Sequence, residues 1–342
     1  MDDAASRAFR LTVLNPGGRD PEQHFPDGAG EPSAAHPPTN FHAFAACTRG
    51  SFHRETRRAI AENTAVLLLL RGDFRHSERA LHELRHAGRT VAVSLKETGL
   101  HQIAAQLHDP DKLGRFVSIV RGADFCLGVT PEAAEIYHSV RGGDKGVAFI
   151  PTPYPVDDSR WDFSKPTAQR SGIFIGTREL DVPSRNHLAA LLLARELSRT
   201  TAERVTAYNF DGRKGARLLR KLEFPPGKLD LLSRRLAYPD YLRELARHKI
   251  VLQLDTSFVP GQVAGDALLA RVPCVGGNGA VDRIAFPETC GAGRSIAELR
   301  DIALRLLSDT AAYQQQVDAI ATNAEQLSFA SGAAELRRLL VA

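Results

Sequence analysis

The segment GDALLARVPCVGGNG, at residues 265–279, decides the fold of this chain. It is typical of a helix that leads through Arg-Val-Pro into a short strand, which ends on Gly-Gly-Asn-Gly. The preceding stretch VLQLDTSFVPGQ, at residues 251–262, is predicted to be another strand that ends in a Gly/Pro loop. Strand, glycine loop, helix, strand and glycine loop in this order indicate an α/β site for a phosphorylated ligand.

Alternating strands and helices are also predicted in the first half of the chain. The run AVLLLL at residues 65–70 is apolar at every position, which predicts a strand buried on both faces, as in a parallel sheet. A long Pro/Gly/His-rich loop at residues 16–40 and a helical region at residues 41–63, interrupted near Gly50, precede this strand. The other first-half strands are predicted at residues 10–15, 90–95, 123–129 and 147–150, with helices at residues 77–88 and 131–140.

The pattern restarts after a proline-rich polar segment at residues 151–171, which is typical of a linker. Strands are predicted at residues 172–176, 204–209, 249–255 and 273–277, and helices at residues 185–198, 238–248, 265–272, 295–307 and 311–327. The prediction is an α/β protein with two Rossmann-like, doubly wound domains, an N-terminal one at residues 1–155 and a C-terminal one at residues 156–315. Terminal helices at residues 316–342 are expected to pack back on the N-terminal domain.

Composition excludes several classes of protein. The chain has 342 residues, a hydrophobic content of 43% and a net charge of +4, which favour a globular protein with an anionic small ligand over a nucleic-acid groove. Its four cysteines have no CxxC spacing, so neither a zinc site nor a disulfide framework is predicted. The longest apolar run is too short to cross a bilayer, and the N-terminus lacks a signal-peptide core. A cytoplasmic protein is expected, with peripheral contact to a membrane left open.

The predicted binding site lies in the loops that follow the strands of the second half, because ligands of open α/β sheets bind at the carboxyl ends of strands. Glycine-rich helix N-termini bind phosphate through backbone amides, and arginines add bidentate charge. Amides of residues 261–263 are expected to hold a diphosphate opposite Arg178 and Arg185, while Asp266 accepts hydrogen bonds from ribose. The complete predicted set is Gly176, Thr177, Arg178, Arg185, Tyr238, Gly261, Gln262, Val263, Asp266, Gly276 and Gly277. Each residue alone also fits an ordinary turn or surface position, so the prediction depends on their joint placement.

The order of these motifs resembles the nucleotide-sugar-binding domain of GT-B glycosyltransferases, in particular the retaining group with an E-x7-E and G-V-P-V-V signature. FIPTPYPVDD at residues 149–158 resembles V-I-P-N-G-V-D, and IFIGTREL at residues 173–180 resembles F-V-G-R-L. LARHKIVLQLDTS at residues 245–257 resembles L-x-x-A-D-V-F-V-L-P-S, and GDALLARVPCVGGNG resembles L-E-A-M-A-C-G-V-P-V-V-A-S. The resemblance covers nearly the whole second half, whereas the first half matches only as a type of domain.

The resemblance implies two domains that face a cleft, a nucleotide-diphosphate sugar as donor, and transfer of its sugar to an acceptor hydroxyl without a metal. Asp266 takes the place of the second Glu, which holds the ribose. Three positions depart from the pattern: Phe258 stands at the first Glu, Arg271 at the glycine of G-V-P, and Lys96 near the family's first-domain histidine.

The first half is expected to bind the acceptor, a glycan or a small molecule. Lys96 or Arg71 is predicted to neutralise the leaving phosphate, and Asp73 or Glu97 to act as a base toward the acceptor hydroxyl. His42 and His53 are alternatives for the base, and the loop at residues 15–20 is a further candidate. No cofactor and no metal are expected. A nucleotide-sugar epimerase of the same fold and a noncatalytic ligand-binding or assembly protein remain alternatives to the transferase.

Overall fold

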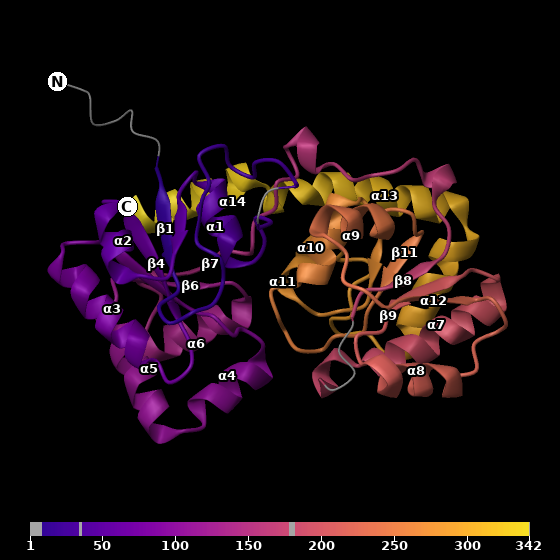
Figure 1. The fold of residues 1–342 in the computed structure, drawn as a ribbon, viewed down its shortest axis with the longest axis horizontal. Helices are drawn as coiled ribbons and strands as arrows, with labels where there is room; N and C mark the ends of the chain where they lie inside the picture. Colours follow the sequence, from indigo (N-terminus) through magenta and orange to yellow (C-terminus); the bar gives the residue numbers. More distant parts are fainter. Residues whose placement is uncertain (1–8, 34–35, 178–181, 342) are drawn as a thin grey trace. The chain divides into compact units, whose positions relative to one another are not determined.

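The computed structural model describes residues 9–33, 36–177 and 182–341, and the chain divides into two units. The first unit contains residues 1–155 and 328–342, and the second contains residues 156–327. Figure 1 shows the helices and strands of each unit along the chain. Among the described residues, no helix combines the length and the apolar character that a membrane-spanning segment requires.

The first unit has a seven-stranded sheet in the order β2-β3-β1-β4-β5-β6-β7, in which β2 alone pairs antiparallel. Its strands are β1 (Leu11–Leu14), β2 (Gln23–His24), β3 (Ser51–His53), β4 (Ala65–Leu70), β5 (Val91–Leu95), β6 (Phe125–Gly128) and β7 (Val147–Phe149). Its helices are α1 (Phe41–Cys47), α2 (Thr56–Ala61), α3 (Arg75–His86), α4 (Leu100–Leu107), α5 (Pro110–Gly122), α6 (Pro131–Arg141) and α14 (Phe329–Val341).

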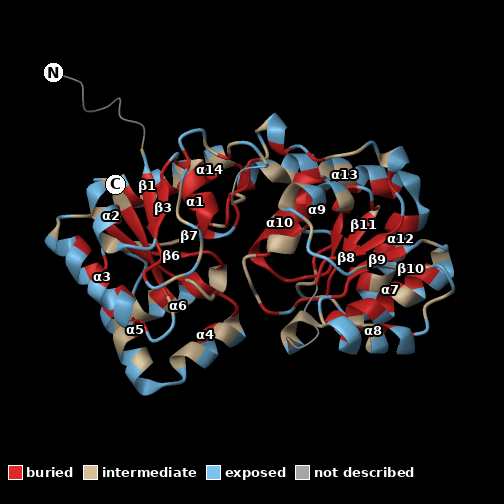
Figure 2. Cartoon of the chain, in the orientation of Figure 1, coloured by how far each residue is buried: buried red, intermediate tan, exposed pale blue. Residues whose placement is uncertain are grey.

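Strand β4 explains why this sheet is covered on both faces. Val66, Leu68 and Leu70 pack in one core with α2, α3, α5 and α6. Leu67 and Leu69 point to the opposite face and pack in a second core with α1 and α14. Figure 2 shows the central strands of this unit, such as β1 and β6, as mainly buried. The predicted burial of AVLLLL on both faces is therefore confirmed.

The second unit has a five-stranded parallel sheet in the order β10-β9-β8-β11-β12. Its strands are β8 (Ile173–Ile175), β9 (Val205–Tyr208), β10 (Leu229–Leu232), β11 (Ile250–Leu252) and β12 (Cys274–Val275). Its α-helices are α7 (His187–Thr201), α8 (Gly212–Lys221), α9 (Tyr238–Leu245), α10 (Gln262–Leu269), α11 (Ala280–Ala285), α12 (Ile296–Ser308) and α13 (Thr310–Ala324). Short 3-10 turns, η1 (Ser159–Trp161), η2 (Thr167–Gln169), η3 (Pro183–Arg185) and η4 (Glu325–Leu327), complete it. The doubly wound α/β architecture predicted from the sequence is confirmed in both units.

Two segments differ from the sequence-based expectation. The region 41–63 is not one interrupted helix, because β3 separates α1 from α2 and pairs with β1. Three residues are too few to show an alternating pattern, so this strand left no periodic signal in the sequence. Residues 210–232 had no predicted element, and the structure places α8 and β10 there.

The C-terminal helices belong to different units. Helix α13 packs on α12 in the second unit. Helix α14 packs on α1 in the first unit, and a Cβ atom at its Gly332 would lie 2.7 Å from Pro153 Cβ. Glycine at this position permits the close approach of the helix to the end of the first unit.

Candidate functional site

The site in the second unit lies at the carboxyl ends of β8 and β11. Strand β8 continues through α7 to β9 on one side, whereas β11 continues through α10 to β12 on the other. The order of strands therefore reverses between β8 and β11, and such a switch point leaves a crevice at the strand ends where α/β proteins bind ligands. The predicted residues after β8 and β11 lie at this position.

Gly176 and Val263 fix the first turn of α10 against the end of β8. A Cβ atom at Gly176 would lie 2.3 Å from Val263 Cγ1 and 3.0 Å from Val251 Cγ1. These distances are far below van der Waals contact, so only glycine allows the helix to begin here. Gly261 caps α10 with φ of 93°, a left-handed conformation that glycine adopts without strain. The first-turn amides of a helix have no intrahelical acceptors, and here they begin beside the switch point.

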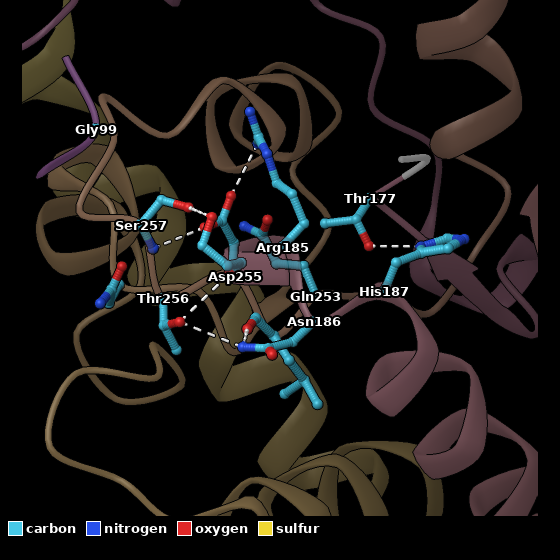
Figure 3. Close-up of polar contacts among 12 residues, drawn as sticks. Gly99, Thr177, Arg185, Asn186, His187, Gln253, Asp255, Thr256 and Ser257 are labelled. Atoms are coloured by element: carbon cyan, nitrogen blue, oxygen red, sulfur yellow. Dashed lines mark hydrogen bonds and ion pairs between the residues drawn. The ribbon is translucent and has the colours of Figure 1, made fainter. Parts of the chain in front are cut away.

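Arg185 forms an ion pair with Asp255 across the switch point (Figure 3). Its Nη1 lies 2.8 Å from Asp255 Oδ2, and the side chain of Asp255 is only 4% exposed. The backbone amide of Ser257 donates to Asp255 Oδ1 at 2.8 Å. Arg185 thus lies where the sequence predicted it, at the strand ends, and it is oriented by a buried carboxylate that the sequence analysis did not single out.

Two further contacts of the loop after β8 were missed from the sequence. Thr177 is buried, and its Oγ1 lies 2.8 Å from Nδ1 of His187, the first residue of α7 (Figure 3). Asn186 Nδ2 donates to the carbonyl of Leu254 at 2.9 Å. The Thr177 bond fastens the end of β8 to the start of α7, and the Asn186 bond joins this connection to the loop after β11. Arg178 lies outside the described residues.

Tyr238 and Asp266, which were both predicted for the nucleotide site, are in contact. The Tyr238 hydroxyl donates to Asp266 Oδ1, and Asp266 is buried in the middle of α10. Tyr238 is the first residue of α9, and its ring lies 6.2 Å from that of Trp161. The hydrogen bond from the Tyr238 hydroxyl therefore fixes the orientation of the buried Asp266 side chain.

The glycines after β12 surround Asp282. A Cβ atom at Gly277 would lie 2.4 Å from Asp282 Oδ1, and the amide of Gly276 donates to the carbonyl of Thr289 at 2.8 Å. Gln253 Nε2 donates to Asp282 Oδ1 at 2.7 Å. Burial, assisted by the charge of Asp255, raises the pKa of Asp282 to about 7. Gly277 therefore packs against a carboxyl group, whereas Gly276 packs against the backbone of Gln253 and its amide is already engaged.

Lys96 lies at the carboxyl edge of the first sheet and pairs with Asp20. Its Nζ is 3.2 Å from Asp20 Oδ2, which also accepts from Asn15 Nδ2 at 2.7 Å. Burial raises the pKa of Asp20, but the charge and hydrogen bond of Lys96 outweigh this, so the pKa lies below its usual value. Arg71, after β4, donates to the carbonyl of Gly17 at 2.8 Å. Asp20 is thus a charged residue of this edge that the sequence analysis named only as part of a loop.

The two histidines proposed as alternative bases have different surroundings. His42 is stacked between His36 and Phe52, with ring centroids 4.1 Å and 3.7 Å away. Its Nε2 lies 2.9 Å from the carbonyl of Pro21, so Nε2 carries the proton and donates. Burial lowers the pKa of His42 to about 4, which keeps the ring neutral at pH 7. His53 instead bonds to Glu62 at 2.9 Å.

The predicted carboxylates Asp73 and Glu97 are not joined to Lys96 by any contact among the described residues. Asp73 is exposed and accepts from the amide of Arg75, the first residue of α3. Glu97 is half-buried beside Lys96 in sequence. The structure therefore brings Lys96 together with Asp20 and not with the two carboxylates that the sequence proposed.

Known proteins resemble this chain in structure but not in sequence. No family model matches the sequence, and no curated protein matches it. Among solved structures, HepE from Anabaena, in complex with UDP and glucose, has a TM-score of 0.60 at 14% identity, covering 97% of this chain and 99% of that one. A UDP-forming α,α-trehalose-phosphate synthase from Burkholderia xenovorans has a TM-score of 0.64 at 10% identity, covering 97% and 99%.

A third similar structure is named as an epimerase and not as a transferase or synthase. The putative UDP-N-acetylglucosamine 2-epimerase from Listeria monocytogenes has a TM-score of 0.51 at 16% identity, covering 83% of this chain and 74% of that one. At such low identity these likenesses show the fold alone. Together with the two doubly wound sheets, they identify the fold of this chain as GT-B, as the sequence predicted.

Proposed function

We propose that this chain is a glycosyltransferase that moves a sugar from a nucleoside-diphosphate donor to an acceptor hydroxyl. The observation that carries the proposal is the contact of Gly176 with Val263, which holds the N-terminus of α10 at the switch point of the second sheet. Amides at the N-terminus of a helix, with an arginine at the same edge of the sheet, support binding of a diphosphate. Its likeness in fold to solved structures in complex with UDP and glucose, and with UDP-glucose, supports the choice of donor.

Each residue of the candidate site then has a role. The amides of Gln262 and Val263 and the guanidinium of Arg185 stabilise the diphosphate as it leaves, without a catalytic metal. Asp266, oriented by Tyr238, accepts hydrogen bonds from the ribose hydroxyls. In the first unit, Lys96 and Asp20 act on the acceptor, with Asp20 as the base toward its hydroxyl.

A noncatalytic binding protein is the second candidate, because the site lacks one carboxylate of the family pattern and one of its loop amides already has a partner. Phe258 stands where the family has its first carboxylate, with φ of 51° and its ring under the guanidinium of Arg283. The amide of Gly276 donates to the carbonyl of Thr289 and not to a ligand. Such a protein binds the donor but does not transfer its sugar.

Calorimetric titration with UDP, GDP, dTDP, ADP and CMP tests the donor site. We expect selective binding of one diphosphate, and Arg185→Ala to weaken it at least tenfold because a charge-assisted hydrogen bond contributes about 1.5–3 kcal/mol. Arg204→Ala is the matched control, since Arg204 also pairs with an aspartate, Asp230, but precedes β9 at the opposite edge of the sheet. Equal binding by both variants would place the phosphate site elsewhere.

Incubation with the nucleotide sugar that binds separates the candidate functions. Release of the nucleotide only with an acceptor supports the transferase. Conversion of the donor into a stereoisomer without an acceptor would indicate an epimerase. Binding without any reaction would favour the noncatalytic protein.

A further inference from the structure

We propose that His24, His53 and Glu62 of the first unit form a binding site for a divalent transition-metal ion, with zinc as the ion that fits its ligands. The three residues come from different elements. His24 ends β2, His53 ends β3, and Glu62 follows the last residue of α2. The site is separate from the candidate donor site, which lies in the second unit.

The register of the strands explains why the two histidines meet. His24 pairs with Ser51 in the antiparallel ladder, and His53 is two residues further along β3. Residues two apart on a strand point to the same face, so His24 and His53 are diagonal neighbours on one face of the sheet. Their rings lie 5.2 Å apart in an edge-to-face arrangement. Helix α2, which links β3 to β4, brings Glu62 to the same position.

The distances between the ligand atoms suit a metal centre. Glu62 Oε1 lies 2.9 Å from His53 Nε2 and 3.6 Å from His24 Nδ1, and one ligand atom from each residue lies within 4.8 Å of the others. Tetrahedral zinc with bonds of about 2.1 Å holds its ligand atoms about 3.4 Å apart. Small side-chain rotations therefore suffice to bind the ion. Two imidazoles and one carboxylate are a zinc-binding set that leaves one position for water or a further ligand.

The charges around the cluster favour a cation. Glu62 contributes a carboxylate whose Oε1 lies close to both imidazoles. Nearby, Glu22 accepts from the backbone amide of Arg54 at 2.8 Å and forms an ion pair with Arg58 Nη1 at 2.7 Å. The site therefore has one carboxylate ligand, and Arg58 is paired with a second carboxylate.

Supporting contacts and access are also present. The Ser51 hydroxyl lies 2.9 Å from His24 Nδ1 and also hydrogen-bonds Glu62, so it can orient the carboxylate once a metal occupies the nitrogen. The side chain of His53 is 4% exposed, so the cluster has one buried imidazole. The side chain of His24 is 66% exposed, which leaves a path for the ion.

A bound ion would fasten β2 to the rest of the sheet. Strand β2 has only two residues and lies at the sheet edge, within the long segment that also contains Asp20. Short edge strands contribute few hydrogen bonds, so a metal that joins β2 to β3 and α2 would stabilise this segment.

Titration of the full chain with Zn²⁺ tests the site by calorimetry and by thermal unfolding, with Co²⁺ absorption as a report of tetrahedral ligation. We expect one equivalent to bind and to raise the unfolding temperature. His24→Ala and Glu62→Gln should each weaken binding at least tenfold and abolish the tetrahedral cobalt spectrum. His82→Ala, an exposed histidine of α3, is the matched control and should bind as the parent does. His53→Ala is expected to weaken binding in the same way as His24→Ala and Glu62→Gln. Because His53 is buried, this variant could fail to fold, and the two more exposed positions then decide the result.

Two outcomes would overturn the proposal. One is no binding of Zn²⁺ at micromolar concentration, and the other is binding that His24→Ala and Glu62→Gln leave unchanged. The three side chains would then form a hydrogen-bonded network that stabilises the sheet edge without a metal. Nucleotide binding by the second unit is measured separately, so its failure would not affect the result.

Discussion

Gly176 lies directly beneath Val263, so closely that a Cβ atom at residue 176 would be 2.3 Å from Val263 Cγ1. This contact sets the position of α10 at the end of β8. Gly176→Ala is expected to push the first turn of α10 away from the strand and to destabilise the second unit by about 1–3 kcal/mol, as overpacking does. Donor binding should fall with it.

Urea unfolding and nucleotide titration of Gly176→Ala measure both effects. Gly114→Ala is the control, and its change in stability should have the opposite sign. Gly114 lies inside α5 with no atom near its added Cβ, so alanine should stabilise that helix by up to about 1 kcal/mol. Unchanged stability of Gly176→Ala would mean that α10 is not held by this contact.

Tyr238→Phe removes the hydroxyl that donates to the buried carboxylate of Asp266. The expected result is a loss of about 1–3 kcal/mol in stability, because a buried carboxyl group loses a hydrogen-bonding partner. Donor binding should weaken as well if Asp266 holds the ribose. Tyr137→Phe is the matched control in the first unit, where the Tyr137 hydroxyl accepts from the Leu95 amide at 2.7 Å. It should reduce stability and leave nucleotide affinity unchanged; equal losses of affinity in both variants would contradict the role of Asp266.

Asp282 makes stability depend on pH in a defined direction. Burial and the charge of Asp255 raise its pKa from 3.8 to about 7, so the folded chain keeps this proton up to about pH 7 while the unfolded chain releases it near pH 4. Between these values the native state binds more protons than the unfolded state, and the contribution of Asp282 to stability falls as pH rises. Above about pH 7 it changes no further.

Asp282→Asn should therefore become more stable relative to the parent as pH rises from 4 to 7. The total gain should be a few kcal/mol at most, because each unit of pKa shift corresponds to about 1.4 kcal/mol. Urea unfolding at pH 5 and pH 8 measures the difference, in which all other titrating groups cancel. A difference that does not change with pH would show that Asp282 is ionised in the folded protein throughout this range.

The pair of Lys96 and Asp20 predicts which first-unit carboxylate serves the reaction. Lys96→Ala and Asp20→Asn should each lower transferase turnover by at least tenfold while the affinity for the nucleotide stays unchanged, because both residues lie in the first unit. Asp73→Asn should leave turnover unchanged, since Asp73 is exposed at the start of α3. Kinetic measurement of the three variants decides between Asp20 and Asp73, and loss of turnover in Asp73→Asn would restore the sequence-based assignment.

Local patterns in the sequence determined the architecture of both units. Continuous apolar runs such as residues 65–70 require burial on both faces, and their alternation with helices leaves few arrangements other than a doubly wound parallel sheet. The strand-end loops of such a sheet bind ligands, so the sequence predicted Gly176, Arg185 and residues 261–263 at the strand ends, and their role in binding stays a prediction. Strand β3 was missed because a strand of three residues has no measurable period.

Only the tertiary structure decided which side chains meet. Arg185 and Asp255 are 70 residues apart, and Lys96 pairs with Asp20 rather than with its neighbour Glu97. His24, His53 and Glu62 come together because β2 pairs with β3 in one register, and the spacing of residues in the sequence does not predict that register. Hydrophobic periodicity is a property of the local chain and survives in the sequence. Partner choice between charged groups depends on how distant loops pack, and one sequence alone carries no record of it.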